Sequence, residues 1–198
     1  MDDESDAAVI AASWYEPARF GTIFDRHVTV LHRYLVRRLG PDDAESMIGD
    51  VFRIAFDRRR TFDLERETAR PWLYGIATNL LAKHRRREAR RIDATARLAA
   101  QRLPPIDLAD GVTGALDASE LWGRVAAALT ALPEPERDAL ILHVWEGLRY
   151  DEVADALGIP TGTVRSRLNR ARGRLRELVG AGGEQAGENR RDTGRIGS

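Results

Sequence analysis

Six arginines and no acidic residue lie between Thr161 and Arg176, and this uncompensated charge is the most distinctive chemical feature of the chain. Guanidinium groups pair with phosphates, and they can also make bidentate contacts with the O6 and N7 atoms of guanine. A helix surface that serves only solubility usually mixes both signs of charge, because residues four apart can then pair. The segment therefore favours DNA binding over the structural alternative, a solvated helix face.

The same segment has the spacing of a helix-turn-helix. We predict two helices, over residues 150–157 and from 161 to about 179, which only three residues separate. Gly158 can adopt the positive φ that ends the first helix. Ala154 is small enough to let the helices cross closely, and Val164 is a branched residue that fills the space between them. The second helix would then enter the major groove of DNA.

Two further charged segments lie in the first half of the chain. Eight Lys or Arg residues face only two acids between Leu81 and Arg102, whereas five acids face one arginine between Pro41 and Asp57. Charge that is segregated in this way indicates faces for different partners. We therefore expect two faces that bind polyanions and a third face that binds a partner of another kind.

The composition narrows the class of protein. The chain has 198 residues with 31 basic and 31 acidic side chains, and it has no cysteine, which excludes disulfides, thiol redox chemistry and cysteine-bound zinc. The apolar run near Met1 is too short for a signal peptide, and no segment is long enough to cross a bilayer. We predict a soluble cytoplasmic protein without membrane insertion.

Hydrophobic periodicity predicts an all-α fold of two small helical domains joined by a flexible linker. The first domain is expected over residues 15–91 and the second over 116–179. Prolines and glycines interrupt the pattern between them, so we interpret residues 92–115 as the linker. Residues 180–198 are rich in Gly, Glu and Arg, and this composition predicts a disordered tail.

The second domain resembles the C-terminal domain of extracytoplasmic-function (ECF) sigma factors, which belong to the sigma-70 family. The resemblance rests on Leu132-Pro133 followed by Arg137, and on the run from Gly162 to Arg167 within the helix-turn-helix. In that family the domain reads the −35 promoter element. The resemblance implies DNA contacts by Thr163, Arg165, Ser166, Asn169 and Arg170.

The first domain resembles the promoter-melting domain of the same family. Ala44-Glu45 and Val51-Phe52 match an acidic helix that docks on the β′ clamp helices of RNA polymerase, which implies polymerase contacts by Glu45 and Asp50. The chain departs from that pattern at Ser46 and Gly49. Trp72-Leu73 and the residues after it match the segment that opens the −10 element. The implied −10 contacts are Phe62, Asn79, Lys83, Arg85, Arg86 and Arg87.

The resemblance implies a sigma factor that binds core RNA polymerase through the β′ clamp helices and the β flap, recognises promoter DNA and initiates transcription. It also implies an anti-sigma factor as a partner, and neither a metal nor another cofactor. The family's linker passes toward the RNA exit path, where Asp107 and Asp110 could mimic RNA phosphates; a solvated loop is the equal alternative.

Two rival functions are compatible with parts of the sequence. A stand-alone regulator could bind duplex DNA through the same helix-turn-helix, without polymerase. An enzyme acting on nucleic acid would need a reactive site, but no Ser/His/Asp group, phosphate-binding glycine loop or pair of carboxylates stands out. The four histidines also lack the spacing of metal ligands, and we expect no catalytic activity: His27, His32, His84 and His143.

Overall fold

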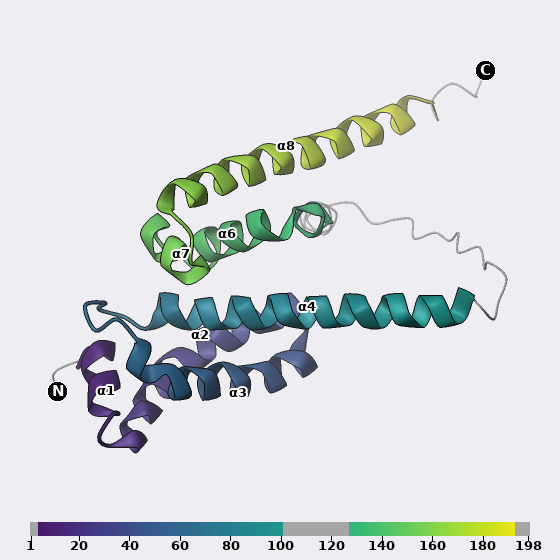
Figure 1. Cartoon of the computed structure of the whole chain (residues 1–198). Coiled ribbons are helices and arrows are strands. Elements are labelled where there is room, and N and C mark those ends of the chain that lie inside the picture. Colours follow the sequence, from purple (N-terminus) through teal and green to yellow (C-terminus); the bar gives the residue numbers. More distant parts are fainter. Residues whose placement is uncertain (1–3, 101–126, 193–198) are drawn as a thin grey trace.

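The computed structural model describes the backbone of residues 4–100 and 127–192, and the side chains of residues 4–91 and 127–178. Every regular element in these ranges is a helix, which confirms the all-α prediction (Figure 1). The first domain contains α1 (Asp6–Ala12), η1 (Pro17–Phe20), α2 (Gly21–Leu39), α3 (Pro41–Arg58), η2 (Arg59–Thr61) and α4 (Arg70–Ala100). The second contains a helical turn at 127–131, α6 (Glu134–Val144), α7 (Tyr150–Leu157) and α8 (Thr161–Asp192).

The first domain is built on an antiparallel pair, α2 and α3, against which α4 packs. Gly40 turns the chain between α2 and α3 with φ of +86°, a conformation that favours glycine, and Pro41 begins α3, where its missing N–H costs nothing. The apolar stripes of the three helices meet in a core that includes the fully buried Leu35, Val51 and Leu73.

An N-terminal helix, which the sequence pattern did not predict, completes this domain. Asp6 is buried, and its carboxylate accepts hydrogen bonds from the His27 ring at 2.6 Å and the Ala69 backbone N–H at 2.8 Å. Burial acts to raise the pKa of Asp6, but these hydrogen bonds, with that of Arg26, outweigh it and hold the pKa well below its ordinary value. Asp6 thus ties α1 to α2 and to the start of α4.

Two helices extend beyond their expected ends. We predicted a linker from residue 92 and a disordered tail from residue 180, yet α4 continues to Ala100 and α8 to Asp192. Neither extension, 92–100 nor 180–192, contains a proline, and extending an existing helix needs no new nucleation. The rest of the predicted linker, including Asp107 and Asp110, lies outside the described residues.

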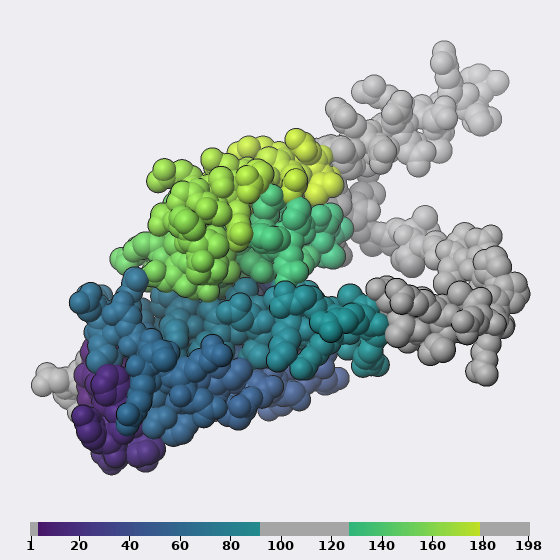
Figure 2. Space-filling model, viewed as in Figure 1, coloured from purple at the N-terminus to yellow at the C-terminus, as the bar shows by residue number. Residues whose placement is uncertain are grey.

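The second domain packs on α4 through α7, and the C-terminal end of α2 also reaches it, because Arg38 pairs with Asp138 of α6 (Figure 1). Buried apolar side chains of both domains form one continuous cluster. Figure 2 shows the second domain, in green to yellow, seated directly against the teal surface of α4. The face of α4 that contacts α7 is therefore covered by the chain itself.

Candidate nucleic-acid interface

The helix-turn-helix has the local geometry that its spacing predicts. Gly158 adopts φ of +63°, and the Ile159 N–H closes the end of α7 by donating to the Ala154 carbonyl at 3.0 Å. Ala154 and Val164 are both buried, and α7 packs on α8. The first turns of α8 can thus enter a major groove as a recognition helix.

The five residues predicted to read the −35 element lie in the first turns of α8. Arg165, Asn169 and Arg170 are exposed, whereas Thr163 and Ser166 are half-buried. The Ser166 hydroxyl donates to the Thr163 carbonyl at 3.0 Å, so this hydroxyl already has a partner. The exposed three supply the long donors and the amide that base edges require.

A buried carboxylate beneath α8 holds two of its arginines. Glu136 in α6 is 6% exposed, and its Oε1 accepts from Arg170 Nε at 3.0 Å while its Oε2 accepts from Arg174 Nη1 at 2.5 Å. An acid in the first turn of a helix is explained by the helix dipole alone. Glu134 lies in the same turn, so nothing in the local sequence distinguishes Glu136 as the partner of α8.

The residues predicted to contact the −10 element fall into two groups. Phe62 is only 5% exposed and packs against the ring of Trp72 with 5.3 Å between the ring centroids. Arg85 Nη2 lies 2.5 Å from Glu134 Oε1, a carboxylate of the second domain. The remaining four residues are exposed along one segment of α4: Asn79, Lys83, Arg86 and Arg87.

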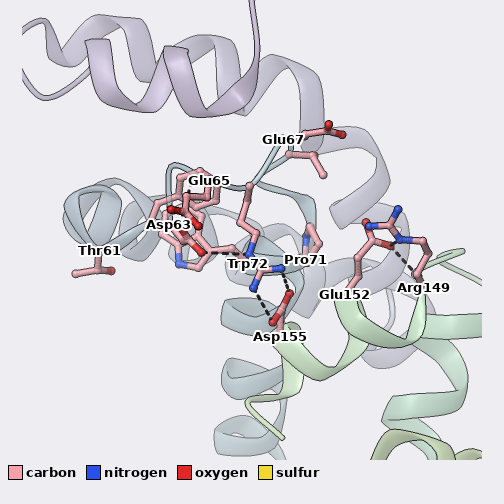
Figure 3. Close-up of a pocket in the computed structure, with 12 residues that line it drawn as sticks. Thr61, Asp63, Glu65, Glu67, Pro71, Trp72, Arg149, Glu152 and Asp155 are labelled. Carbon is pink, nitrogen blue, oxygen red and sulfur yellow. Dashed lines mark hydrogen bonds and ion pairs between the residues drawn. The ribbon is translucent and has the colours of Figure 1, made fainter. Parts of the chain in front are cut away.

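A hollow of about 540 Å³ lies beside Phe62, between the loop before α4 and the helix α7 (Figure 3). Arg66 bridges it, donating to Asp155 Oδ1 of α7 at 3.0 Å and to Asp63 Oδ2 at 3.2 Å. The loop also contributes Glu65 and Glu67 to the lining, and α7 contributes Glu152. The acids outnumber the bases around this hollow, and in this arrangement it would repel a phosphate.

The residues predicted to dock on polymerase, Glu45 and Asp50, are both exposed on α3. Glu45 Oε2 lies 3.4 Å from His32 Nε2, and Asp50 Oδ1 lies 3.1 Å from Arg53 Nη2. A second hollow, of about 330 Å³, lies between α3 and α4, and its lining includes Ser46, Asp50, Lys83 and Arg87. The predicted polymerase and −10 surfaces are therefore adjacent.

Within the ranges that the structure describes, no cluster of His, Cys, Asp or Glu is arranged to hold a metal ion. In the same ranges, no helix has the length and apolar character needed to cross a membrane.

Comparison with known families agrees with this geometry. Residues 23–91 match the family described as Sigma-70 region 2, and residues 122–175 match Sigma-70, region 4. These matches cover the first domain from α2 onward and the helix-turn-helix domain. The fold and the two matches define a protein of the sigma-70 class.

Individual relatives narrow the class. The chain is 30% identical over 166 residues to the ECF RNA polymerase sigma factor SigL of Mycobacterium tuberculosis, covering 83% of this chain and 91% of SigL. It is 33% identical over 181 residues to SigE of Mycolicibacterium smegmatis, covering 90% of this chain and 66% of SigE. The chain belongs to the ECF sigma factors. As a sigma factor it binds core RNA polymerase, recognises promoter elements and initiates transcription.

Solved structures show the same arrangement of helices. CnrH, solved in complex with the cytosolic domain of CnrY, aligns with a TM-score of 0.62 and 26% identity over 89% of this chain and 97% of CnrH. The sigma factor RpoE of Bartonella quintana, solved with the anti-sigma factor NepR, aligns with a TM-score of 0.59 and 24% identity over 81% of this chain and 96% of RpoE.

Proposed function

We propose that the two domains divide promoter recognition between α4 and α8. The observation that carries this proposal is that each domain exposes its own group of basic and amide side chains, on two helices that α6 and α7 separate (Figure 1). Arg165 and Asn169 read bases of the −35 element in the major groove, and Thr163, Ser166 and Arg170 contact the DNA beside them. Arg174 binds phosphate.

At the −10 element, the exposed residues of α4 meet the DNA first. Asn79 reads a base edge, while Lys83, Arg86 and Arg87 hold the phosphates of the strand that is separated. Melting costs a few kcal/mol per base, which stacking on an aromatic ring can offset. Phe62 supplies that ring. Its side chain is covered in the present arrangement, so the hollow beside it has to open first.

The polymerase contacts lie on α3 and on the second domain. Glu45 and Asp50 dock on the β′ clamp helices, and their exposure supports this role because a docking charge must reach its partner. The second domain binds the β flap. Ser46 differs from the family pattern. It nevertheless lines the hollow between α3 and α4 together with Asp50, and so remains part of the docking surface.

The same protein has an anti-sigma partner that contacts both domains. The support is the likeness to CnrH, whose structure was solved with the cytosolic domain of CnrY. The chain acts in the cytoplasm, where its polymerase and promoters are, and it contributes binding rather than catalysis, without a metal or other cofactor.

In vitro transcription tests the proposal. Core polymerase, with and without the full chain, is incubated with fragmented genomic DNA, and the transcript start sites are mapped. We expect starts that depend on the chain and share −10 and −35 sequences. Tight binding of the free chain to duplex operators, with no chain-dependent starts, would instead identify a stand-alone regulator.

A further inference from the structure

The loop that joins η2 to α4, residues 62–69, lines one side of the hollow beside Phe62 (Figure 3). The five side chains at 63–67 are all exposed. Hydrogen bonds within this stretch centre on Asp63, whose carbonyl accepts from the Arg66 N–H at 3.1 Å and whose Oδ2 accepts from Arg66 Nε at 3.2 Å. A loop with so few buried contacts has little stability of its own. Its shape is therefore set where its two ends meet the rest of the domain.

A carboxylate of α1 holds the end of this loop that enters α4. Asp6 Oδ2 accepts from the Ala69 backbone N–H at 2.8 Å and from the Thr68 hydroxyl at 3.2 Å. The Thr68 oxygen in turn accepts from the Arg70 backbone N–H at 3.2 Å, so the hydroxyl gives its single proton to Asp6. The negative charge of Asp6 thus lies at the start of α4, where the helix dipole favours it.

The main chain just after α1 holds the other end of the loop. Arg59 Nε donates to the Ser13 carbonyl at 3.3 Å, and Arg60 Nη2 donates to the Trp14 carbonyl at 3.5 Å. Both arginines belong to η2, which runs directly into Phe62. Figure 1 shows α1 beside the loop that leads into α4. The N-terminal segment therefore contacts the loop at its beginning and at its end.

The burial of Asp6 is more than its own helix requires. An acid that only complements the dipole of its helix can stay at the surface, whereas Asp6 is 6% exposed, and a buried charge is costly unless it is paired. His27 Nε2 at 2.6 Å and Arg26 Nη1 at 2.9 Å complete its set of donors. The match to Sigma-70 region 2 begins at residue 23, so it does not account for α1 or for this carboxylate.

We propose that Asp6 is a positioning residue for recognition of the −10 element, which fixes the loop 62–69 so that the hollow beside Phe62, once open, receives a base of the separated strand. This inference rests on the role proposed above for Phe62. A loop loses conformational freedom when it encloses a base, and a loop already held at both ends has less of it to lose. Asp6 is buried, so it acts through the loop and touches no nucleic acid itself.

Binding of the holoenzyme to promoter DNA with a single-stranded −10 element tests this role. Core polymerase is assembled with the full chain, and affinities are measured for the preferred −10 sequence and for a series that changes one base at a time. We expect Asp6→Ala to lose about tenfold in discrimination at one −10 position, the size of one base–aromatic stacking contact. Discrimination at the other −10 positions and along the −35 element should stay parental, whereas a general loss of fold would weaken binding to every sequence alike.

Glu4→Ala is the matched control in the same segment. The Glu4 carboxylate pairs with Arg19, and the two side chains are 41% and 39% exposed, so this change removes an acid two residues away and leaves the contacts of Asp6 in place. It should keep the parental discrimination at every position. Parental discrimination in Asp6→Ala, or the same loss in Glu4→Ala, would overturn the proposal.

Thr68 gives a second test that leaves the other partners of Asp6 in place. Thr68→Val removes the hydroxyl and keeps the shape of the side chain, whereas Thr68→Ser keeps the hydroxyl. For Thr68→Val we expect a loss of about threefold at the same −10 position, as for one hydrogen bond, and for Thr68→Ser the parental value. Combining Thr68→Val with Asp6→Ala should cost no more than Asp6→Ala, because Thr68 acts through the same carboxylate. If Asp6→Ala fails to assemble with core polymerase, parental discrimination in Thr68→Val overturns the proposal.

The parent protein separates this inference from the proposed function. If the parent holoenzyme discriminates along the −10 element and Asp6→Ala discriminates equally well, only the role of Asp6 is wrong. If the parent itself shows no discrimination along the −10 element, the proposed function is at fault, and the role of Asp6 falls with it.

Discussion

The arginines of α4 and those of α8 are held by carboxylates of different origin. Arg85 pairs with Glu134, a residue 49 positions away in the other domain, whereas Arg170 and Arg174 pair with Glu136 of their own domain. Separating the domains would therefore release Arg85 and leave the two arginines of α8 in place. The −10 surface depends on the arrangement of the domains, and the −35 surface is formed within one domain.

Among the charge substitutions, removing Glu136 should have the largest effect on stability, because it breaks the pairing inside the second domain. Glu136→Ala leaves Arg170 and Arg174 without their buried partner, and we expect a loss of about 2–3 kcal/mol in the free energy of unfolding. Binding to −35 duplexes by the holoenzyme should weaken as well. Denaturant unfolding and a −35 substitution series measure the two effects.

Glu134→Ala is the matched control, since Glu134 lies in the same turn of α6 but pairs across the domains. It should alter the distance between the domains and leave −35 discrimination unchanged. Loss of −35 discrimination in Glu134→Ala, or its retention in Glu136→Ala, would contradict the distinction between the two carboxylates.

Arg165 differs from Arg170 and Arg174 because it is exposed and no carboxylate among the described residues pairs with it. If it makes a bidentate base contact, Arg165→Ala should cost about 1–3 kcal/mol on the preferred −35 sequence and flatten discrimination at one base position. Arg174→Ala should weaken all sequences alike. Holoenzyme binding to a −35 series decides, and uniform weakening by Arg165→Ala would make Arg165 a phosphate contact.

A substitution at Asn79 in α4 tests promoter melting separately from initial binding. Asn79→Ala removes an exposed amide, so the fold should be unaffected while the amount of open complex falls. Permanganate reactivity of the −10 thymines measures opening, and closed-complex formation is the internal control. Phe62→Ala is a poorer test, because truncating a buried Phe costs about 3–5 kcal/mol in stability. Parental thymine reactivity in Asn79→Ala would refute its role.

Arg85→Ala tests whether the arginine shared between Glu134 and DNA reaches phosphate in the holoenzyme. We expect the slope of log affinity against log salt to fall by about one unit, as for the loss of one phosphate contact. Arg33→Ala, an exposed arginine on α2, should leave the slope unchanged. An unaltered slope in Arg85→Ala would confine Arg85 to the interface between domains.

Charge reversal on α3 should have the smallest effect on the fold itself. Glu45→Lys and Asp50→Lys alter exposed side chains, so the free energy of unfolding should change by less than about 0.5 kcal/mol. Assembly with core polymerase should nevertheless weaken. A pull-down titration measures the affinity, and parental affinity in both variants would exclude these residues from the docking surface.

Local signals in the sequence determined the helix-turn-helix and the DNA-binding chemistry of this protein. The bounds of α7 and the start of α8 follow from periodicity, from Gly158 and from the small and branched residues at 154 and 164. These signals act between residues a few positions apart, where helix geometry alone fixes which side chains meet. The order of the two domains along the chain follows from the same hydrophobic periodicity.

Tertiary structure alone decided which of the predicted DNA contacts are available. Arg170 pairs with a residue 34 positions away, and Arg38 with one 100 positions away. Helix periodicity carries no information at such separations, because it places residues on a face without stating what covers that face. The burial of Phe62 and the close approach of Gly75 to the Ala156 carbonyl oxygen depend on the same packing of α4 against its neighbours. The sequence thus determined the recognition helix. Packing within the second domain decided that Arg170 and Arg174 pair with Glu136, and packing between the domains decided that Arg85 pairs with Glu134.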